Sequence, residues 1–109
     1  ESIQRVLINL LHNAIKFTPQ NGKITVRTYT DRDKVFIAVE DNGKGISKED
    51  LPNIFERFYK TDKSRSADRS GLGLGLAIVR NIIVAHNETI KVESEEGHGS
   101  IFTFSLRSV

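Results

Sequence analysis

The sequence contains no cysteine, two prolines and an excess of only two positive charges. Without cysteine the chain cannot form disulfides, thiolate metal sites or a cysteine nucleophile, and this composition fits a cytosolic setting. The small charge excess, from 16 basic and 14 acidic residues, gives no indication of a nucleic-acid partner. No apolar run is long enough to cross a membrane, because Arg80 and Asn81 interrupt the longest one. We therefore expect no nucleic acid and no direct membrane contact for this chain.

The length and composition are those of one small globular domain. At 109 residues the chain can bury a single core of modest size, and 38% apolar with 28% charged residues is typical of a soluble, folded protein. The chain has no methionine at its start, and its first residues already follow a helical pattern. We expect residues 1–109 to be one domain taken from a longer protein.

Apolar residues recur every three or four positions in two long segments, which predicts two amphipathic helices. The first covers residues 3–17 and ends before Pro19. The other starts near Leu76 and ends at His86-Asn87. Pro52 favours a further short helix over Pro52–Tyr59. The sequence thus predicts three helical segments.

Alternating apolar and polar residues predict two pairs of strands. One pair includes Ile24–Val26 and Val35–Val39 and is joined by polar residues 31–34. The other includes Ile90–Val92 and Phe102–Leu106 and is joined by residues 95–99. Helices that cover one face of an antiparallel sheet are the simplest way to bury both sets of apolar residues. We therefore expect an α+β fold, a two-layer α/β sandwich with three helices on one face of a mixed, mainly antiparallel sheet.

Three polar residues lie on one face of the first predicted helix, opposite much of its apolar stripe. Asn9, Asn13 and Lys16 follow one another at i, i+4 and i+7. Amide oxygens are suitable Mg²⁺ ligands and a lysine ammonium can neutralise a phosphate, so this face could hold a metal–phosphate pair. An ordinary solvated helix face is the alternative interpretation. Asparagine is a poor helix former, however, so two of them inside one helix call for a reason.

Two glycine-containing segments lie next to predicted secondary structure. Asp41–Gly45 follows the second predicted strand, where a carboxylate could accept a hydrogen bond from a buried amino group such as that of adenine. A polar turn is the alternative for this segment. Gly71, Gly73 and Gly75 lead into the last predicted helix. The backbone amides of such a helix start can be directed at a phosphate, although a flexible connector would have the same composition.

Residues 60–70 contain no aliphatic side chain larger than alanine, which predicts a long basic loop. A binding module that grips an acidic partner is a possible function from another class, because basic residues outnumber acidic ones in this loop: Lys60, Lys63, Arg65 and Arg69 against Asp62 and Asp68. His12, His86 and His98 are scattered along the chain without metal-ligand spacing.

Taken in order, these segments resemble the catalytic, ATP-binding domain of two-component sensor histidine kinases. Asn9–Phe17 is similar to that family's N box, and Asp41–Gly45 is similar to its first glycine box. Ile54–Tyr59 is similar to the F box, Gly71–Gly75 to the second glycine box, and Gly97–Gly99 to the small terminal one. The match covers essentially the whole chain. The resemblance also implies the Bergerat (GHKL ATPase) fold, which gyrase and certain chaperones share.

The resemblance implies a role for each residue of the N box and of the loop that follows. Asn13 would ligate Mg²⁺ with help from Asn9, Lys16 would contact the phosphates of ATP, and Phe17 would pack near the nucleoside. Asn9, Lys16 and Lys60 would take part in the catalytic step. Asp41 would bind the adenine amino group, in a pocket shaped by Gly43, Gly45, Ile46 and Phe58.

The remaining implied roles belong to the second half of the chain. Residues 60–70 would form a lid that closes over the triphosphate, and Thr103 would support the adenine site. The start of the last helix would contact the phosphates through Gly71, Leu72, Gly73, Leu74, Gly75 and Leu76.

Four positions differ from the residues that are common in the family. Lys60 stands where arginine is common, so a bidentate phosphate contact becomes a single point contact. Leu72 replaces a small polar residue, and Phe17 stands where tyrosine is frequent and cannot hydrogen bond. Asn87-Glu88 replaces a glycine-rich helix end, where Asn can adopt the left-handed cap. None of these differences removes the predicted site.

The resemblance implies a function for the chain and for its parent protein. The domain would bind Mg–ATP and donate the γ-phosphate to a histidine on a separate dimerisation domain of the same parent, from which the phosphoryl group would pass to a response regulator. It would be a cytoplasmic domain of a parent anchored in the cell membrane, and on its own it would bind ATP but be nearly inactive.

A hydrolase of the gyrase and chaperone type is the alternative within ATP chemistry. Those relatives carry a glutamate general base at the position of Asn9, whose amide cannot take a proton from water. A serine kinase that acts on anti-sigma partners is disfavoured for the same reason.

Overall fold

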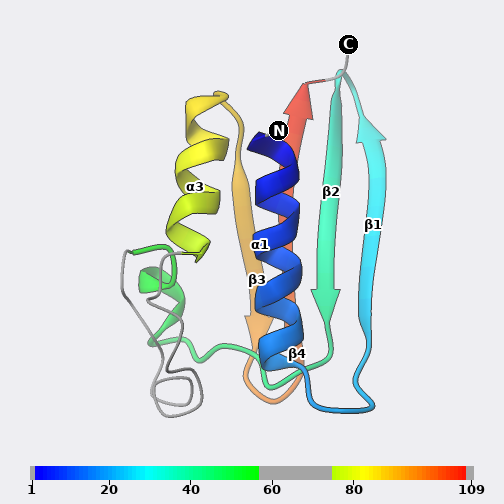
Figure 1. The fold of residues 1–109 in the computed structure, drawn as a ribbon, viewed down its shortest axis with the longest axis vertical. Helices are drawn as coiled ribbons and strands as arrows, with labels where there is room; N and C mark the ends of the chain where they lie inside the picture. The colour runs from blue at the N-terminus through cyan, green and yellow to red at the C-terminus, as the bar shows by residue number, and fades with distance from the viewer. Residues whose placement is uncertain (1, 57–74, 108–109) are drawn as a thin grey trace.

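The computed structural model describes residues 2–56 and 75–107 of the chain. This part of the molecule has two layers (Figure 1): helices α1 (Ser2–Phe17) and α3 (Gly75–Ala85) pack side by side on one face of a sheet. The four strands are β1 (Ile24–Asp31), β2 (Lys34–Asp41), β3 (Ile90–Glu95) and β4 (Gly99–Arg107). They lie in the order β1-β2-β4-β3, and each neighbouring pair is antiparallel. The predicted α+β sandwich is confirmed.

Both predicted hairpins are present, and residues with positive φ make their tight turns. Arg32 has a φ of 61° between β1 and β2, and Gly97 has a φ of 87° between β3 and β4. The left-handed region is accessible to glycine without steric cost, which suits Gly97 to its turn. These turns place β1 and β3 at the two edges of the sheet and β2 and β4 in its centre.

The hydrophobic core lies between the helices and the sheet. Side chains alternate along a strand, so Phe102 and Phe104 of β4 face the helices together with Val39, which pairs with Phe102 in register. The helices complete this core with Val6, Leu10, Ala14, Val79 and Ile83. Because Val6, Leu10 and Ala14 of α1 recur at i, i+4 and i+8, they lie on one face of the helix, whereas Ile8 and Ile15 lie outside this core and are exposed.

The prediction of three helices is wrong for the described residues. Where the sequence predicts a helix over Pro52–Tyr59, the structure has one 3₁₀ turn, Leu51–Asn53, and then turn residues up to position 56. Ile54 is buried, and the ring of Phe55 packs edge-on against Phe102 with the centroids 6.2 Å apart. Backbone hydrogen bonds from the N–H of Asn53 to the carbonyl oxygen of Asp50 and from the N–H of Glu56 to that of Asn53 hold this short segment, together with the packing of its side chains on the core. The described sheet is also wholly antiparallel, where the sequence predicts a mixed one.

A buried carboxylate joins the end of α3 to the sheet. The chain leaves α3 at Asn87, whose φ of 59° is the left-handed conformation predicted there. Glu88 follows with its side chain only 4% exposed, and it accepts hydrogen bonds from Lys34 Nζ and Ser105 Oγ, each at 2.7 Å. These bonds, that of Lys34 first, hold the pKa of Glu88 below its ordinary value. The carboxylate of Glu88 thus ties the end of α3 to β2 and β4.

Candidate functional site

The polar face of α1 lies next to the first residue of α3. Asn9 and Asn13 are half-buried and Lys16 is exposed. A Cβ atom placed on Gly75 would lie 3.9 Å from Oδ1 of Asn9, and Figure 1 shows the two helices adjacent on the same side of the sheet. The N-terminus of a helix has unpaired N–H groups and the positive end of the helix dipole. The amide side chain of Asn9 and the start of α3 are therefore close enough to contact one ligand.

Asp41, the last residue of β2, is a buried hydrogen-bond acceptor. It is 6% exposed, and its Oδ1 accepts the N–H of Gly43 at 2.9 Å. Burial raises the pKa of this carboxyl group; hydrogen bonds from the backbone of Gly43 and Ser100 act against that rise, and the charge of Glu40 adds to it. A carboxylate can accept about four hydrogen bonds, so two backbone donors leave capacity for an N–H group of a ligand.

Two glycines after Asp41 are required by close packing. A Cβ on Gly43 would lie 2.2 Å from the carbonyl oxygen of Phe17, the last residue of α1. Gly45 has a φ of 73°, and a Cβ there would lie 2.2 Å from the carbonyl oxygen of Glu95. Only glycine fits where backbone meets backbone at this distance. The loop is therefore in direct contact with the end of α1 and with the β3–β4 hairpin.

Hydrogen bonds hold the same loop in place. The N–H of Lys44 donates to the carbonyl oxygen of Phe17 at 3.4 Å, and the N–H of Gly97 donates to the carbonyl oxygen of Lys44 at 2.7 Å. The N–H of Ile46 donates to Oγ of Ser94 at 2.8 Å. The predicted pocket residues of this loop thus form one ordered unit with Phe17.

Ser100 supports Asp41, and Ser94 in turn contacts Ser100, although no motif marks either serine. Ser100 is buried, pairs with Asp41 across β2 and β4, and pairs with Ser94 across β3 and β4. The hydroxyl groups of Ser94 and Ser100 lie 2.8 Å apart, and Oγ of Ser94 donates to the carbonyl oxygen of Gly99 at 2.8 Å. Ser100 directly follows the Gly97–Gly99 motif, but only the strand register shows that it lies beside Asp41.

Thr103, which is predicted to support the adenine site, does not pair with Asp41. It is buried, but it pairs with Ala38 of β2 and with Lys91 of β3. Because side chains alternate along β4, Thr103 faces the side of the sheet opposite to Ser100 and Asp41. Direct support of Asp41 thus comes from Ser100, and the role of Thr103 in the adenine site stays a prediction.

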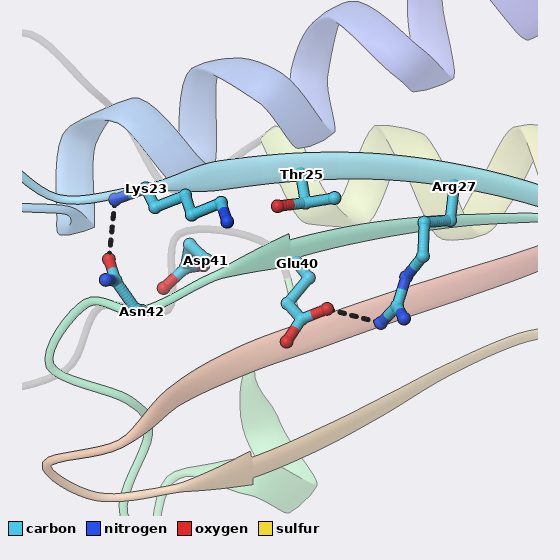
Figure 2. A pocket seen from close by; sticks show the side chains of 6 residues that line it. All are labelled: Lys23, Thr25, Arg27, Glu40, Asp41 and Asn42. Atoms are coloured by element: carbon cyan, nitrogen blue, oxygen red, sulfur yellow. Dashed lines mark hydrogen bonds and ion pairs between the residues drawn. The ribbon is translucent and has the colours of Figure 1, made fainter.

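A hollow of about 270 Å³ opens beside Asp41 at the end of the β1–β2 pair (Figure 2). Arg27 forms an ion pair with Glu40 inside it, and the N–H of Lys23 donates to Oδ1 of Asn42 at 2.7 Å. The lining is wholly polar or charged: Lys23, Thr25, Arg27, Glu40, Asp41 and Asn42. By strand alternation Thr25, Arg27 and Glu40 belong to the sheet face that the helices do not cover. The hollow is thus a neighbour of the candidate site and shares Asp41 with it.

The structure brings together part of the predicted set. Asn9 lies close to Gly75, and Phe17 lies close to Gly43. The second half of α1 is therefore a neighbour of both the loop after β2 and the start of α3. Leu76 is half-buried and packs against the core. The other predicted residues lie outside the described part of the chain: Phe58, Lys60, Gly71, Leu72, Gly73, Leu74 and the whole segment 60–70.

The side chains that could hold a metal are amides. Within residues 2–56 and 75–107, no group of three or more His, Cys, Asp or Glu side chains is placed to bind a metal ion. A divalent cation at this site would need the amide oxygens of Asn9 and Asn13 together with oxygens of a ligand and of water. Such a hard, incomplete set of protein ligands fits Mg²⁺, which commonly retains waters and binds substrate phosphates.

The described helices include none that is long and apolar enough to cross a membrane.

Comparison with known proteins gives matches over the whole chain. The family model described as histidine kinase-, DNA gyrase B-, and HSP90-like ATPase matches residues 1–109. The chain is 41% identical to the phosphate regulon sensor protein PhoR of Pseudomonas aeruginosa over 95 residues, which are 87% of this chain and 21% of that protein. The chain spans only part of these relatives, for example 12% of the sensor protein KdpD of Clostridium acetobutylicum and 26% of the sensor-like histidine kinase SenX3 of Mycolicibacterium smegmatis.

The backbone of this chain is similar to those of solved histidine kinase structures. The catalytic domain of the histidine kinase ThkA, solved free of nucleotide, is 37% identical with a TM-score of 0.82, over 98% of this chain and 66% of that one. Full-length ShkA in complex with AMPPNP is 31% identical with a TM-score of 0.85, over 99% of this chain and 22% of that one.

Proposed function

The chain belongs to the family of histidine kinase-, DNA gyrase B- and HSP90-like ATPases, and from this membership we propose that it binds Mg–ATP and supplies the γ-phosphate for phosphorylation of a histidine. Its relatives are named as sensor histidine kinases, which are ATP-dependent protein kinases, and the chain matches their catalytic, ATP-binding domain. The accepting histidine belongs, in this proposal, to a dimerisation domain of the same parent protein. A response regulator then receives the phosphoryl group.

The observation that carries the proposal is the meeting of α1 and α3 at Asn9 and Gly75. An amide face and a helix N-terminus at that distance can contact the same polyphosphate, because N–H groups at a helix start favour anions. Lys16, exposed one helical turn beyond Asn13, adds a positive charge on this face. The complex of ShkA with AMPPNP supports an ATP-like ligand for this fold.

In this proposal Asp41 makes the site specific for adenine. Its buried carboxylate accepts a hydrogen bond from the amino group of adenine, and burial strengthens that bond because the local dielectric is low. Gly43 and Gly45 let the base approach the backbone of the loop. Ser100 fixes the carboxylate through its backbone N–H.

The phosphate end depends on Asn9 and Asn13. Both amides would hold Mg²⁺, which when bound neutralises charge on the phosphates. Lys60 and the glycines before Gly75 remain proposed phosphate contacts from the sequence.

In the transfer step the bond from the γ-phosphorus to the oxygen of ADP breaks, and a bond from phosphorus to a ring nitrogen of the histidine forms. Catalysis of phosphoryl transfer is mainly positioning and charge neutralisation. The residues of this chain orient the triphosphate and supply positive charge. Asn9 cannot take a proton from water, which favours transfer to a protein acceptor over hydrolysis.

Calorimetric titration of the chain with Mg–ATP tests the binding step, and saturable binding that adenosine competes with is expected. For the transfer step, the chain is mixed with ATP and a dimerisation domain of its parent, and acid-labile phosphohistidine is measured. A chain that binds Mg–ATP but forms no phosphohistidine would refute the kinase assignment. The cytoplasmic location of the domain and the membrane anchoring of its parent are part of the same proposal.

A further inference from the structure

Lys44, between the two packed glycines of the loop, makes a contact that the motifs do not predict. Its Nζ lies 4.8 Å from the centroid of the Phe17 ring, and Nζ of Lys16 lies 5.7 Å from the same centroid. An ammonium within about 6 Å of an aromatic face is attracted to it. Lys44 is the closer of the two and comes from a different segment of the chain than the helix that carries Phe17.

The backbone of Lys44 is fixed on both sides. Its N–H donates to the carbonyl oxygen of Phe17, and its own carbonyl oxygen accepts the N–H of Gly97. The glycines before and after it admit no side chain, because carbonyl oxygens of Phe17 and Glu95 lie where a Cβ would be. The Lys44 side chain therefore starts from a defined place and reaches the ring with little freedom in its backbone.

We propose that Lys44 is a positioning residue of the nucleotide site, whose ammonium holds the ring of Phe17 in the orientation that packs against the nucleoside. The inference rests on the proposed function, because it assigns Phe17 to the nucleotide site. Phenylalanine has no hydroxyl group with which to fix its own orientation, so packing, the contact with Lys44 and the longer contact with Lys16 set the position of the ring. Lys44 acts on the ligand through Phe17 and not by its own contact.

A double-mutant cycle in this chain tests the proposal. Lys44→Met keeps the length of the side chain and removes its charge, and we expect it to weaken Mg–ATP and adenosine alike by about two- to fivefold, the range of one cation–π contact. Lys44→Arg should restore the affinity. In a Phe17→Leu background, Lys44→Met should have no further effect. Lys48→Met, in an exposed position shortly after the loop, is the matched control and should bind like the wild type.

The ring itself provides a second readout that needs no ligand. The aromatic NMR resonances of Phe17 should move in Lys44→Met and stay unchanged in Lys48→Met, while the other core resonances show that both variants are folded. Unmoved Phe17 resonances would overturn the inference, whether or not the chain binds ATP.

Other results would also refute the role of Lys44. If Lys44→Met lowers the affinity for Mg–ATP but not for adenosine, Lys44 contacts the ligand directly. The same conclusion follows if Lys44→Met still lowers the affinity in the Phe17→Leu background. Unchanged affinity in Lys44→Met would show no role. A wild-type chain that binds neither Mg–ATP nor adenosine would instead overturn the proposed function.

Discussion

Replacing Asp41 should have opposite effects on stability and on nucleotide binding. The carboxyl group is buried, and burial raises its pKa from an ordinary value of 3.8. The folded chain therefore holds this proton more tightly than the unfolded chain does. The resulting stability is complete below the unfolded pKa and is lost as the pH rises through the folded pKa. At pH 7 the charged side chain thus costs stability, and Asp41→Asn should raise the melting temperature of the ligand-free domain and flatten its dependence on acid pH.

The expected loss of affinity follows from the proposed hydrogen bond between Asp41 and adenine. A hydrogen bond to a charged group contributes about 1.5–3 kcal/mol and a neutral one about 0.5–1.5 kcal/mol. Asparagine can keep only the neutral bond, so Asp41→Asn should weaken adenosine binding by about five- to tenfold, and Asp41→Ala by about ten- to 150-fold. Calorimetric titrations with adenosine and thermal melts between pH 4 and 7 measure both effects. Unchanged adenosine affinity in Asp41→Ala would refute the assignment of this residue, and a pH profile of Asp41→Asn parallel to the wild type would refute the burial argument.

Three further substitutions test separate parts of the structure. Gly43→Ala should destabilise the domain by about 1–3 kcal/mol in denaturant melts, because its Cβ would lie 2.2 Å from the carbonyl oxygen of Phe17; a wild-type melt would contradict this packing. Asn13→Ala should change the melting temperature little and remove the Mg²⁺ dependence of ATP affinity in titrations with and without EDTA. If the dependence persists, Asn13 is not a ligand. Glu88→Gln should lower the melting temperature at pH 7 and reduce the loss of stability in acid. The bond from Lys34 lowers the pKa of Glu88, so its contribution is present above the ordinary value of 4.5 and is lost as the pH falls through the lower folded value. Equal acid sensitivity of both proteins would contradict this account.

The parts of the fold that follow from local pattern are the parts that the sequence predicts correctly. The apolar spacing of residues 3–17 predicts the helix and the burial of Val6, Leu10 and Ala14, although Ile15 of the same pattern is exposed. The alternation in β1 and β2 has the period of a strand. The segment after Pro52 has no such period. It forms a single 3₁₀ turn whose following residues, Ile54 and Phe55, pack on the core, and this packing depends on residues far away in the sequence.

In the candidate site, too, the features formed by adjacent residues are predicted from the sequence, and the contacts between distant residues are not. The Asp41–Gly45 loop is visible in the sequence because its residues are adjacent, and the structure explains its glycines by backbone contact. Ser100 lies beside Asp41 because of the register of β4 against β2, which no local pattern reveals. The bond between Lys34 and Glu88 joins positions 54 residues apart and is likewise invisible in the sequence.

The central claim is that one triphosphate is held between the amide face of α1 and the start of α3. The most direct test is an NMR titration of the isotope-labelled chain with Mg–ATP that follows the side-chain amides of Asn9 and Asn13 and the backbone amide of Gly75. We predict that all three resonances shift along one saturation curve with a single dissociation constant. Shifts at the asparagines that leave Gly75 unmoved at saturation, or the reverse, would contradict the claim.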